Sequence, residues 1–274
     1  MPPDPTILVF DSGLGGLTVF REIANDIAKT DSAARLLYAA DDAFFPYGGH
    51  GERELVTRVV AVIGDLITAH GPDLVVIACN TASTIALPAL RQRFQVPFVG
   101  TVPAIKPACQ GSRSKRVSVL GTEATVAREY TKALIREYGQ GCDVTLVGSG
   151  TLAAFAEAAL RAEPVDDAVL RQEIAPCFVD DGERRTDTVV LACTHYPLLR
   201  DRLERCAPWP VAWIDPAPAI ARRVSELLRE RLRTPETTAE RPRTARGIFT
   251  SGRPPSPALA AALASFGIGE TAPV

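Results

Sequence analysis

The sequence predicts an α/β protein with largely parallel sheets, organised as two similar domains. Short apolar runs of strand length alternate with segments of helical periodicity, which is the pattern of βαβ units. The pattern also starts a second time near the middle of the chain. With 274 residues, the chain is long enough for two such domains with substantial cores.

The first part of the chain alternates between expected strands and helices in a regular order. Ile7–Phe10 is an uninterrupted apolar run, and Asp11 opens a glycine-rich turn that ends where helical periodicity begins. The loop from Asp41 to Gly51 interrupts the pattern with Pro-Tyr-Gly. The expected strands are Ile7–Phe10, Leu36–Ala40, Leu74–Ala78 and Pro97–Val99. The expected helices are Leu17–Ala28, Glu52–His70 and Thr81–Phe94.

The second part of the chain repeats this alternation. A turn at 121–125 follows the first strand, as the glycine-rich turn does above. The expected strands are Arg116–Leu120, Asp143–Val147, Thr188–Ala192, Val211–Ile214 and Gly247–Thr250. The expected helices are Val126–Tyr138, Leu152–Arg161, Asp166–Val179, Tyr196–Arg205, Ala217–Leu232 and Pro257–Phe266. A polar stretch at 234–246 separates the last two of these helices.

Two pairs of segments indicate an internal duplication. The run Leu-Val-Val-Ile-Ala-Cys that ends at Cys79 matches Thr-Val-Val-Leu-Ala-Cys, which ends 114 residues later at Cys193. The opening strand-turn-helix has a counterpart 109 residues later, from Ile7 to Arg116. Because unrelated elements share nearly the same offset, we expect two domains of similar topology.

Two cysteines stand where chemistry is expected in such a fold. Cys79 and Cys193 each follow a strand of an open α/β sheet, the end at which functional groups gather. Each also opens the helix expected after it, whose N–H groups and dipole lower a thiol pKa. Two thiols that face one ligand suit two-base racemisation, in which one takes a proton from carbon and the other donates to the opposite face. His195 follows Cys193 closely and is expected to take part.

Other interpretations of these residues remain open at this stage. A zinc site would need Cys79, Cys193 and His195 to converge, since the cysteines form no close ligand pair. A dinucleotide site would use the glycine-rich turn and Asp41, although Thr18 stands where that motif needs glycine or alanine. The N–H groups of the turn could instead hold a carboxylate or a phosphate. The cysteines expected to be inert are Cys109, Cys142, Cys177 and Cys206.

Composition excludes several classes of protein. Hydrophobic residues make up 46% and charged residues 23% of the chain, as in ordinary globular proteins. The formal net charge is -2, so no basic excess suggests a nucleic-acid partner. The apolar runs fall far short of the roughly 20 residues of a membrane-spanning helix. No signal-peptide pattern precedes Ile7, and we expect a cytoplasmic protein.

Four longer motifs stand in order along the chain. They are Asp-Ser-Gly-x-Gly-Gly-Leu-Thr-Val at 11–19, Pro-Tyr-Gly at 46–48, Cys-Asn-Thr-Ala-Ser at 79–83 and Cys-Thr-His-Tyr-Pro-Leu-Leu at 193–199. With Ile-Asp-Pro at 214–216 and Thr-Ser-Gly at 250–252, they resemble the motifs of glutamate racemases, in the aspartate/glutamate racemase family. The resemblance implies a cofactor-independent enzyme that interconverts L- and D-glutamate for peptidoglycan synthesis.

The resemblance also implies roles for individual residues. Cys79 matches the thiol that deprotonates D-glutamate, and Cys193 matches the thiol that deprotonates L-glutamate. Asp11 matches the group that assists the first thiol, and His195 the group that assists the second. Glu157 resembles a further assisting glutamate, although the proline that usually precedes it is absent. The residues that match substrate-holding positions are Asp11, Ser12, Tyr47, Gly48, Asn80, Thr81, Thr194 and His195.

For the whole molecule, the resemblance implies two α/β domains in pseudo-twofold relation, with the active site in the cleft between them. Residues 1–101 and 214–274 would form the first domain and 102–213 the second. It further implies a homodimer, with no metal and no membrane partner. Because few residues precede Ile7, we expect activity without the nucleotide-linked activator that some members need. Phe44 stands where arginine is common, and Ala192 where glycine is common.

Two other functions remain as alternatives. A related racemase or decarboxylase would act on aspartate or another small acid, although a decarboxylase of this superfamily needs only one such thiol. An amino-acid-binding or regulatory protein would bind a ligand without turnover. Measured interconversion of glutamate enantiomers would separate these alternatives from the leading hypothesis.

Overall fold

The computed structural model describes residues 4–29, 34–232 and 245–273, which form two sheets flanked by helices. The strands of the first sheet are β1 (Thr6–Asp11), β2 (Arg35–Ala40), β3 (Leu74–Ile77), β4 (Phe98–Gly100), β9 (Ala245–Phe249) and β10 (Ile268–Pro273). The strands of the second sheet are β5 (Arg116–Thr122), β6 (Asp143–Ser149), β7 (Thr188–Ala192) and β8 (Ala212–Ile214).

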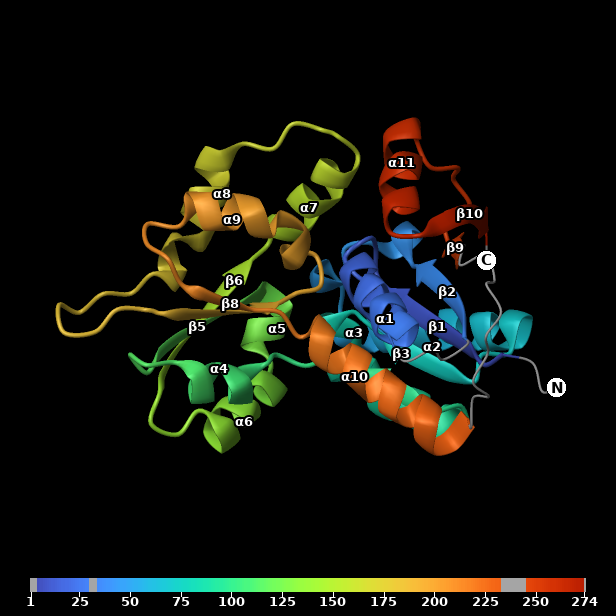
Figure 1. Ribbon diagram of the computed structural model, residues 1–274, viewed down its shortest axis with the longest axis horizontal. Coiled ribbons are helices and arrows are strands. Elements are labelled where there is room, and N and C mark those ends of the chain that lie inside the picture. The colour runs from blue at the N-terminus through green and yellow to red at the C-terminus, as the bar shows by residue number, and fades with distance from the viewer. Residues whose placement is uncertain (1–3, 30–33, 233–244, 274) are drawn as a thin grey trace.

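Helices connect these strands in the order that the sequence predicts. Those that flank the first sheet are α1 (Leu17–Lys29), α2 (Glu52–His70), α3 (Asn80–Arg93), α10 (Ala217–Leu227) and α11 (Pro257–Ser265). Those that flank the second sheet are α4 (Ile105–Gly111), α5 (Glu123–Ala127), α6 (Glu129–Tyr138), α7 (Leu152–Leu160), α8 (Asp167–Ile174) and α9 (Arg200–Cys206). Figure 1 shows the two α/β domains side by side.

The two sheets share one strand order, as the duplication predicts. The first runs β10-β9-β2-β1-β3-β4 and the second β6-β5-β7-β8. The order β2-β1-β3-β4 therefore recurs as β6-β5-β7-β8, with every pairing parallel. The carboxyl ends of β3 and β7 become equivalent positions, and these are the ends that precede the two predicted cysteines. The predicted fold class is confirmed.

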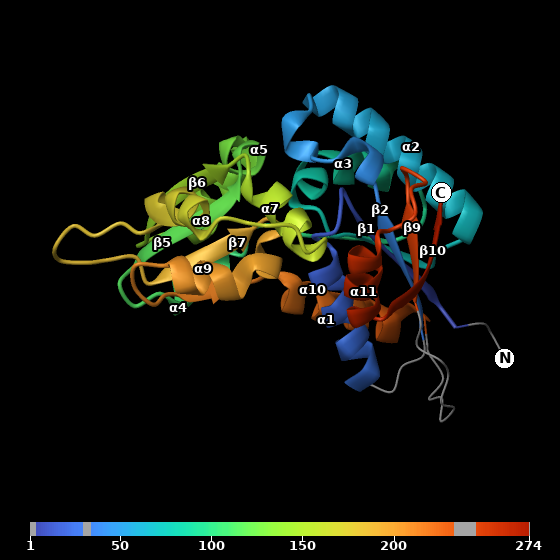
Figure 2. The same cartoon turned by 90° about the horizontal axis from the view of Figure 1, so that it is seen from above.

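The first sheet is buried on both faces, which explains its continuous apolar strands. Ile7 and Val9 of β1 belong to the core formed with α1 and α10. Leu8 and Phe10 point the other way, into the core formed with α2 and α3. Figure 2 shows α2 and α3 on one side of this sheet and α1 and α10 on the other. Packing on both faces fixes where the carboxyl end of each strand lies.

The second sheet is covered in the same way. Leu120 and Leu191 pack with residues of α7, α8 and α9. Val119 and Val190, which point to the other face, pack with residues of α4 and α6. The two domains thus each hold an independent core on either side of a parallel sheet.

The structure corrects several predicted elements. The helix predicted at Val126–Tyr138 is divided into α5 and α6, because Arg128 has an extended backbone with φ -70° and ψ 141°. The helix predicted at Tyr196–Arg205 begins with a 3-10 turn, Tyr196–Leu199, and becomes α-helical only in α9. The helix predicted at Asp166–Val179 ends earlier, at the end of α8. Strand β10 and helix α4 were not predicted.

The remaining differences lie toward the C-terminus. The predicted helix Ala217–Leu232 is α-helical to Leu227 and continues as a π-helical turn, Leu228–Leu232. Most of the predicted polar stretch, residues 234–244, lies outside the described residues. Of the helices in the described part of the chain, none has the length and apolar character needed to cross a membrane.

Candidate active site

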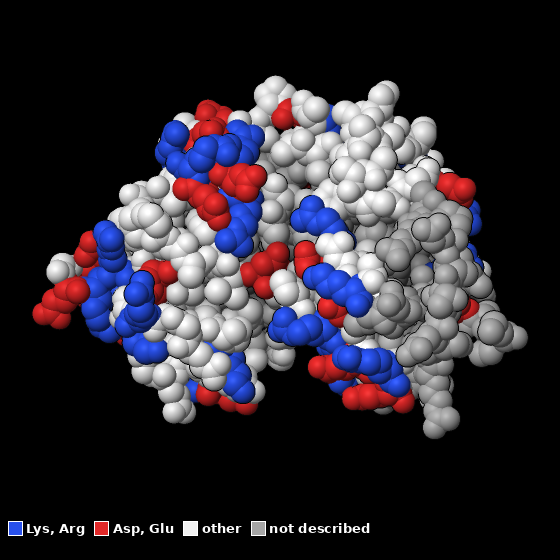
Figure 3. Space-filling view, viewed as in Figure 1, with Lys and Arg blue, Asp and Glu red and all other residues white. Residues whose placement is uncertain are grey.

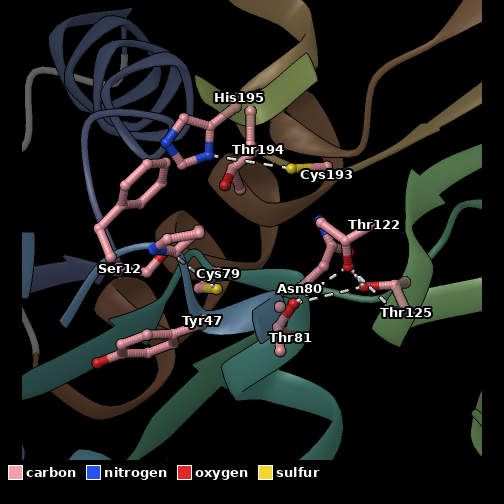
Figure 4. A pocket seen from close by; sticks show the side chains of 14 residues that line it. Ser12, Tyr47, Cys79, Asn80, Thr81, Thr122, Thr125, Cys193, Thr194 and His195 are labelled. Carbon is pink, nitrogen blue, oxygen red and sulfur yellow. Dashed lines mark hydrogen bonds between the residues drawn. The ribbon is translucent and has the colours of Figure 1, made fainter. Parts of the chain in front are cut away.

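The predicted functional residues meet in a pocket between the two domains. Both domains contribute to its lining, and Figure 4 shows the side chains that face it. From the first domain come Ser12, Phe45, Pro46, Tyr47, Gly48, Cys79, Asn80 and Thr81. From the second come Thr122, Thr125, Ala153, Cys193, Thr194 and His195. Two further predicted residues, Asp11 and Glu157, lie buried behind this lining and hydrogen-bond to it.

Cys79 stands at the point where β3 ends and α3 begins. It is the N-cap residue of α3, as predicted, and is buried, with its Sγ 3.7 Å from the hydroxyl of Ser12. Burial and the nearby charge of Asp11 raise the pKa of the Cys79 thiol to about 12. The hydrogen bonds from Ala82 and Ser12 act in the opposite direction but do not outweigh burial. The N–H of Ala82 at the helix N-terminus lowers this pKa, as predicted, but burial and Asp11 outweigh it, so the expected net decrease is wrong.

Cys193 occupies the equivalent position after β7 but lacks the equivalent helix. Its carbonyl accepts the N–H of Tyr196 in a tight turn, and the α-helix begins only at Arg200. The dipole argument therefore does not apply to Cys193. A different group stands beside this thiol: Nδ1 of His195 lies 3.9 Å from Cys193 Sγ.

His195 and Glu157 form a buried pair behind Cys193. His195 Nε2 lies 3.0 Å from Glu157 Oε1, and both side chains are almost fully enclosed. Burial lowers the pKa of His195, but the hydrogen bonds with Cys193 and Glu157 outweigh it and raise that pKa well above its ordinary value. Burial raises the pKa of Glu157, but His195, the N–H of Leu14 and the charge of Arg161 leave it below its ordinary value. The favoured state is an imidazolium that donates to a carboxylate.

The glycine-rich turn of the first domain reaches across to this pair. The N–H of Leu14 donates to Glu157 Oε1 at 2.6 Å, and the N–H of Gly15 faces His195 Nε2 at 3.2 Å. Only a deprotonated Nε2 can accept from Gly15, whereas a protonated one donates to Glu157. From the sequence, the N–H groups of this turn could hold a carboxylate or a phosphate. In the structure the N–H of Leu14 holds a carboxylate, that of Glu157 from the other domain.

A second link between the domains involves the Asp11 carboxylate. Asp11 is fully buried at the end of β1, and its Oδ1 accepts the hydroxyl of Thr194 at 3.1 Å. Its Oδ2 accepts the N–H of Gly13 at 3.1 Å. Asp11 therefore fixes the turn of its own domain and a lining residue of the other.

Asn80 is the polar side chain of the lining whose hydrogen bonding is least satisfied. It is 3% exposed, and among the described residues neither its amide nitrogen nor its amide oxygen has a partner. A buried amide with no hydrogen bonds costs folding free energy. In Figure 4 Asn80 lies among the lining residues between the two domains. A ligand with both hydrogen-bond donors and acceptors would satisfy it.

The hydroxyl of Thr81 meets two threonines that sequence reasoning missed. Thr81 Oγ1 lies 3.5 Å from the hydroxyls of both Thr122 and Thr125. Thr122 is the N-cap of α5 and accepts the N–H of Thr125. The turn at 121–125 had been noted as the counterpart of the glycine-rich turn, so the duplication carried a signal for these residues. The sequence alone did not show that this turn faces Thr81.

Tyr47 and Gly48 reach the pocket from a loop. The hydroxyl of Tyr47 points away from the two sulfurs in Figure 4 and donates to Asp41 at 2.7 Å. A Cβ added to Gly48 would lie 3.5 Å from the side chain of Thr122, so this glycine stands close to the second domain. The backbone of the loop therefore lines the pocket, and the ring of Tyr47 packs into the core of the first domain.

The zinc alternative fails on geometry. Within the described ranges, no group of three or more His, Cys, Asp or Glu side chains is arranged to hold a metal ion. Cys79, Cys193 and His195 line one pocket without forming such a group.

The fold and the pocket define a class of enzyme, and comparison with known proteins identifies it. The model of the Asp/Glu/Hydantoin racemase family matches residues 7–224, and the chain belongs to this family. It is thus an isomerase of the racemase class, and its similar relatives carry a more specific name. It is 55% identical over 226 residues to the glutamate racemase of Brucella anthropi, covering 82% of this chain and 80% of the relative.

Solved structures agree with this assignment. The glutamate racemase of Escherichia coli, solved with L-glutamate and the activator UDP-MurNAc-Ala, superposes with a TM-score of 0.87 at 38% identity. The match covers 99% of this chain and 98% of that one. The glutamate racemase RacE1 of Bacillus anthracis superposes with a TM-score of 0.79 at 25% identity, covering 98% and 97% of the two chains.

Proposed function

We propose that this enzyme interconverts L- and D-glutamate by two-base proton transfer between Cys79 and Cys193, without a cofactor. The observation that carries the proposal is the placement of these two thiols. They follow equivalent strands, β3 and β7, and line one pocket from opposite domains. Relatives that match most of the chain are named glutamate racemases.

The proposed step moves one proton off Cα and another onto it. With D-glutamate bound, the Cys79 thiolate removes the Cα proton, and the electron pair left on carbon takes the proton of the Cys193 thiol on the opposite face. The product is L-glutamate, with Cys79 protonated and Cys193 ionised. The reverse reaction exchanges the two roles.

Neighbouring groups would prepare each thiol for its role. The charge of Asp11 raises the pKa of Cys79, which makes the Cys79 thiolate a stronger base, and the Asp11 carboxylate would attract the substrate ammonium. His195 faces the Cys193 sulfur and would stabilise its thiolate as an imidazolium. Glu157 would act through His195 by holding that ring charged. Glu157 is thus a positioning residue in this scheme.

The polar lining would hold the two carboxylates of glutamate. The groups suited to this are the hydroxyls of Ser12, Thr81 and Thr194, the amide of Asn80 and the backbone at Tyr47 and Gly48. Aspartate is shorter and could not keep both carboxylates paired while its Cα lies between the sulfurs. Buried polar groups left unpaired by the shorter substrate weaken its binding.

The absence of a cofactor is part of the proposal. The lysines of the chain are Lys29, Lys106, Lys115 and Lys132. None of them lines the pocket, so an imine with pyridoxal phosphate has no anchor there.

Domain limits, assembly and biological role complete the proposal. We assign 1–101 and 214–274 to the first domain and 102–213 to the second; this follows the sheet that each strand joins except at β8, whose last residue, Ile214, still pairs with Val190 in the second sheet. A homodimer, a cytoplasmic location and a supply of D-glutamate to peptidoglycan synthesis stay predictions. Figure 3 shows acidic and basic side chains interspersed on the face in view, so this face offers no support for nucleic-acid binding.

Isotope incorporation tests the proposal. Purified enzyme is given D-glutamate or L-glutamate in deuterated water, and circular dichroism and proton NMR follow inversion and Cα deuteration. At early times we expect deuterium in the product and little in recovered substrate, because each thiol serves its own face. Rapid deuteration of recovered substrate would indicate a single base. Aspartate turned over as well as glutamate would contradict the substrate assignment, and an inactive enzyme would contradict the proposed function.

A further inference from the structure

Asp41 is a fully buried carboxylate outside the pocket lining, and the proposed reaction does not use it. It follows β2 directly, with 0% of the residue exposed, and its backbone N–H donates to the carbonyl of Asp11 at 2.9 Å. A buried carboxylate is stable only where hydrogen bonds and opposite charge replace its hydration. The partners of Asp41 therefore show what it holds in place.

Asp41 gathers side chains from three segments of the chain. Arg58 of α2 donates through Nε to Oδ2 at 3.0 Å and through Nη2 to Oδ1 at 2.7 Å. Thr250, just after β9, donates its hydroxyl to Oδ1 at 2.6 Å. Tyr47 donates its hydroxyl to Oδ2 at 2.7 Å. Each carboxylate oxygen thus accepts two hydrogen bonds, and this charged, bidentate geometry is a rigid one.

The cluster also holds the start of the pocket loop. The Thr250 hydroxyl that donates to Asp41 accepts the N–H of Ala43 at 3.2 Å. The guanidinium of Arg58 lies over the ring of Phe44, 5.6 Å from its centre. These contacts therefore fix the loop at Ala43 and Phe44, and the hydrogen bond to Asp41 fixes it again at Tyr47.

The orientation of Tyr47 connects this cluster with the pocket. Its hydroxyl end is bound by Asp41, outside the pocket, while Tyr47 and Gly48 line the pocket beside the thiols. A shift of the Tyr47 ring would carry the Gly48 backbone with it, because the two residues share one short helical turn, Tyr47–Gly49.

We propose that Asp41, Arg58 and Thr250 are positioning residues that fix the loop at 45–48 for substrate binding. The proposal deepens the proposed function and rests on it, because it assumes that this loop holds the substrate. It makes a residue near the C-terminus, Thr250, part of the support for the substrate site. It also explains why Asp41 is buried without being a ribose-binding acid.

A positioning role predicts a specific kinetic effect. The backbone at Tyr47 and Gly48 takes no part in the proposed proton transfer, so it would hold the substrate equally in the ground state and in the transition state. Loss of such uniform binding raises KM and leaves kcat nearly unchanged. A cluster that serves only stability would change the melting temperature without changing KM.

The test compares two substitutions at one position. Thr250→Val keeps the shape of the side chain but removes the hydrogen bonds of the hydroxyl with Asp41, Asp42 and Ala43, whereas Thr250→Ser keeps the hydroxyl. We expect Thr250→Val to raise KM for both enantiomers by about tenfold with kcat within about threefold, and Thr250→Ser to restore a near wild-type KM. Arg58→Lys, which loses the bidentate geometry, should give an intermediate KM.

A second measurement does not depend on the substrate. Amide hydrogen exchange of the ligand-free proteins should show faster exchange at residues 42–50 in Thr250→Val than in Thr250→Ser, with α6 unchanged in both. Unchanged loop exchange would overturn the proposal whatever the enzyme's substrate. Faster exchange with a wild-type KM would also overturn it, because the loop would then not position substrate. A wild-type enzyme inactive on glutamate would count against the proposed function, while the exchange data would still decide whether the cluster holds the loop.

Discussion

Gly15 and His195 lie so close together that a side chain on the glycine has no room. A Cβ at Gly15 would stand 2.4 Å from Nδ1 of His195 and 2.6 Å from its backbone nitrogen. The two residues are 180 positions apart and belong to different domains. This contact brings the turn that follows β1 against the histidine that serves Cys193. The contact between the two domains and the arrangement of the site therefore depend on each other.

Gly15→Ala should consequently impair catalysis while each domain still folds. The added methyl group would meet the backbone nitrogen of His195, and backbone cannot move aside as the end of a flexible side chain can. We expect each domain to fold and the turnover in both directions to fall by about 10²-fold or more, because misplacement of reacting groups by about 1 Å has costs of this order. Gly111→Ala is the matched control, since a Cβ there meets nothing within 4 Å. Wild-type turnover by Gly15→Ala would show that the site tolerates separation of the domains.

Substitution of either proposed catalytic thiol should abolish inversion in both directions. Each direction needs one base and one acid, so Cys79→Ala and Cys193→Ala should each lose at least about 10³-fold in kcat. Cys79→Ala retains the base proposed for L-glutamate and should still exchange the Cα proton of that enantiomer in deuterated water. Cys142→Ser, at a half-buried cysteine outside the pocket, should keep full activity. Inversion by either alanine variant would exclude the two-thiol mechanism.

Asn80→Ala should weaken substrate binding without lowering the stability of the protein. The buried amide of Asn80 has no hydrogen-bond partner in the described part of the chain, so Asn80→Ala removes an unsatisfied group and should leave the melting temperature unchanged or raised. The same change removes hydrogen bonds to the bound substrate, worth about 1–3 kcal/mol, and should raise KM about ten- to a hundredfold. Gln92→Ala, an exposed amide on the same helix, provides the comparison. A marked loss of stability in Asn80→Ala with unchanged KM would assign the residue to the fold.

The sequence predicted the repeated topology of the two domains better than the chemistry of single groups. The duplication placed Cys79 and Cys193 at equivalent strand ends because apolar runs and their spacing are local properties of the sequence. The helix N-terminus at Cys79 can be predicted locally, whereas burial and the charge of Asp11, which raise the pKa of this thiol, depend on residues brought together only by folding. Thr122 was missed for the same reason, since its role depends on the contact between domains.

Asp41 illustrates a related limit. In the sequence it stands after the second strand, where a dinucleotide-binding protein has its ribose-binding acid. What excludes that role is its set of partners, Arg58 and Thr250, which lie 17 and 209 positions away along the chain. Strand β10 escaped prediction because its alternating, mostly exposed residues lack the apolar run that marks the central strands.

Alkaline pH should destabilise the protein through its buried thiols, and Cys177 allows this to be measured away from the active site. Cys177 is fully buried in the second domain, and burial raises the pKa of its thiol from 9.0 to about 12. Between these values the unfolded chain loses the proton and the folded protein keeps it. The neutral thiol therefore contributes stability that is complete below about pH 9 and is lost as pH rises toward 12.

The linkage relation gives the expected loss of unfolding free energy at alkaline pH. From pH 8 to pH 10, Cys177 should account for about 1 kcal/mol of lost unfolding free energy. Urea unfolding of the wild type and of Cys177→Ala at both pH values measures this directly. The variant is expected to be less stable at pH 8, because a buried group is lost, but to lose about 1 kcal/mol less on going to pH 10. The pKa of Cys79 is also raised to about 12, so part of the alkaline decline should persist in the variant. Equal declines in the two proteins would show that Cys177 titrates in the folded state as it does in the unfolded chain.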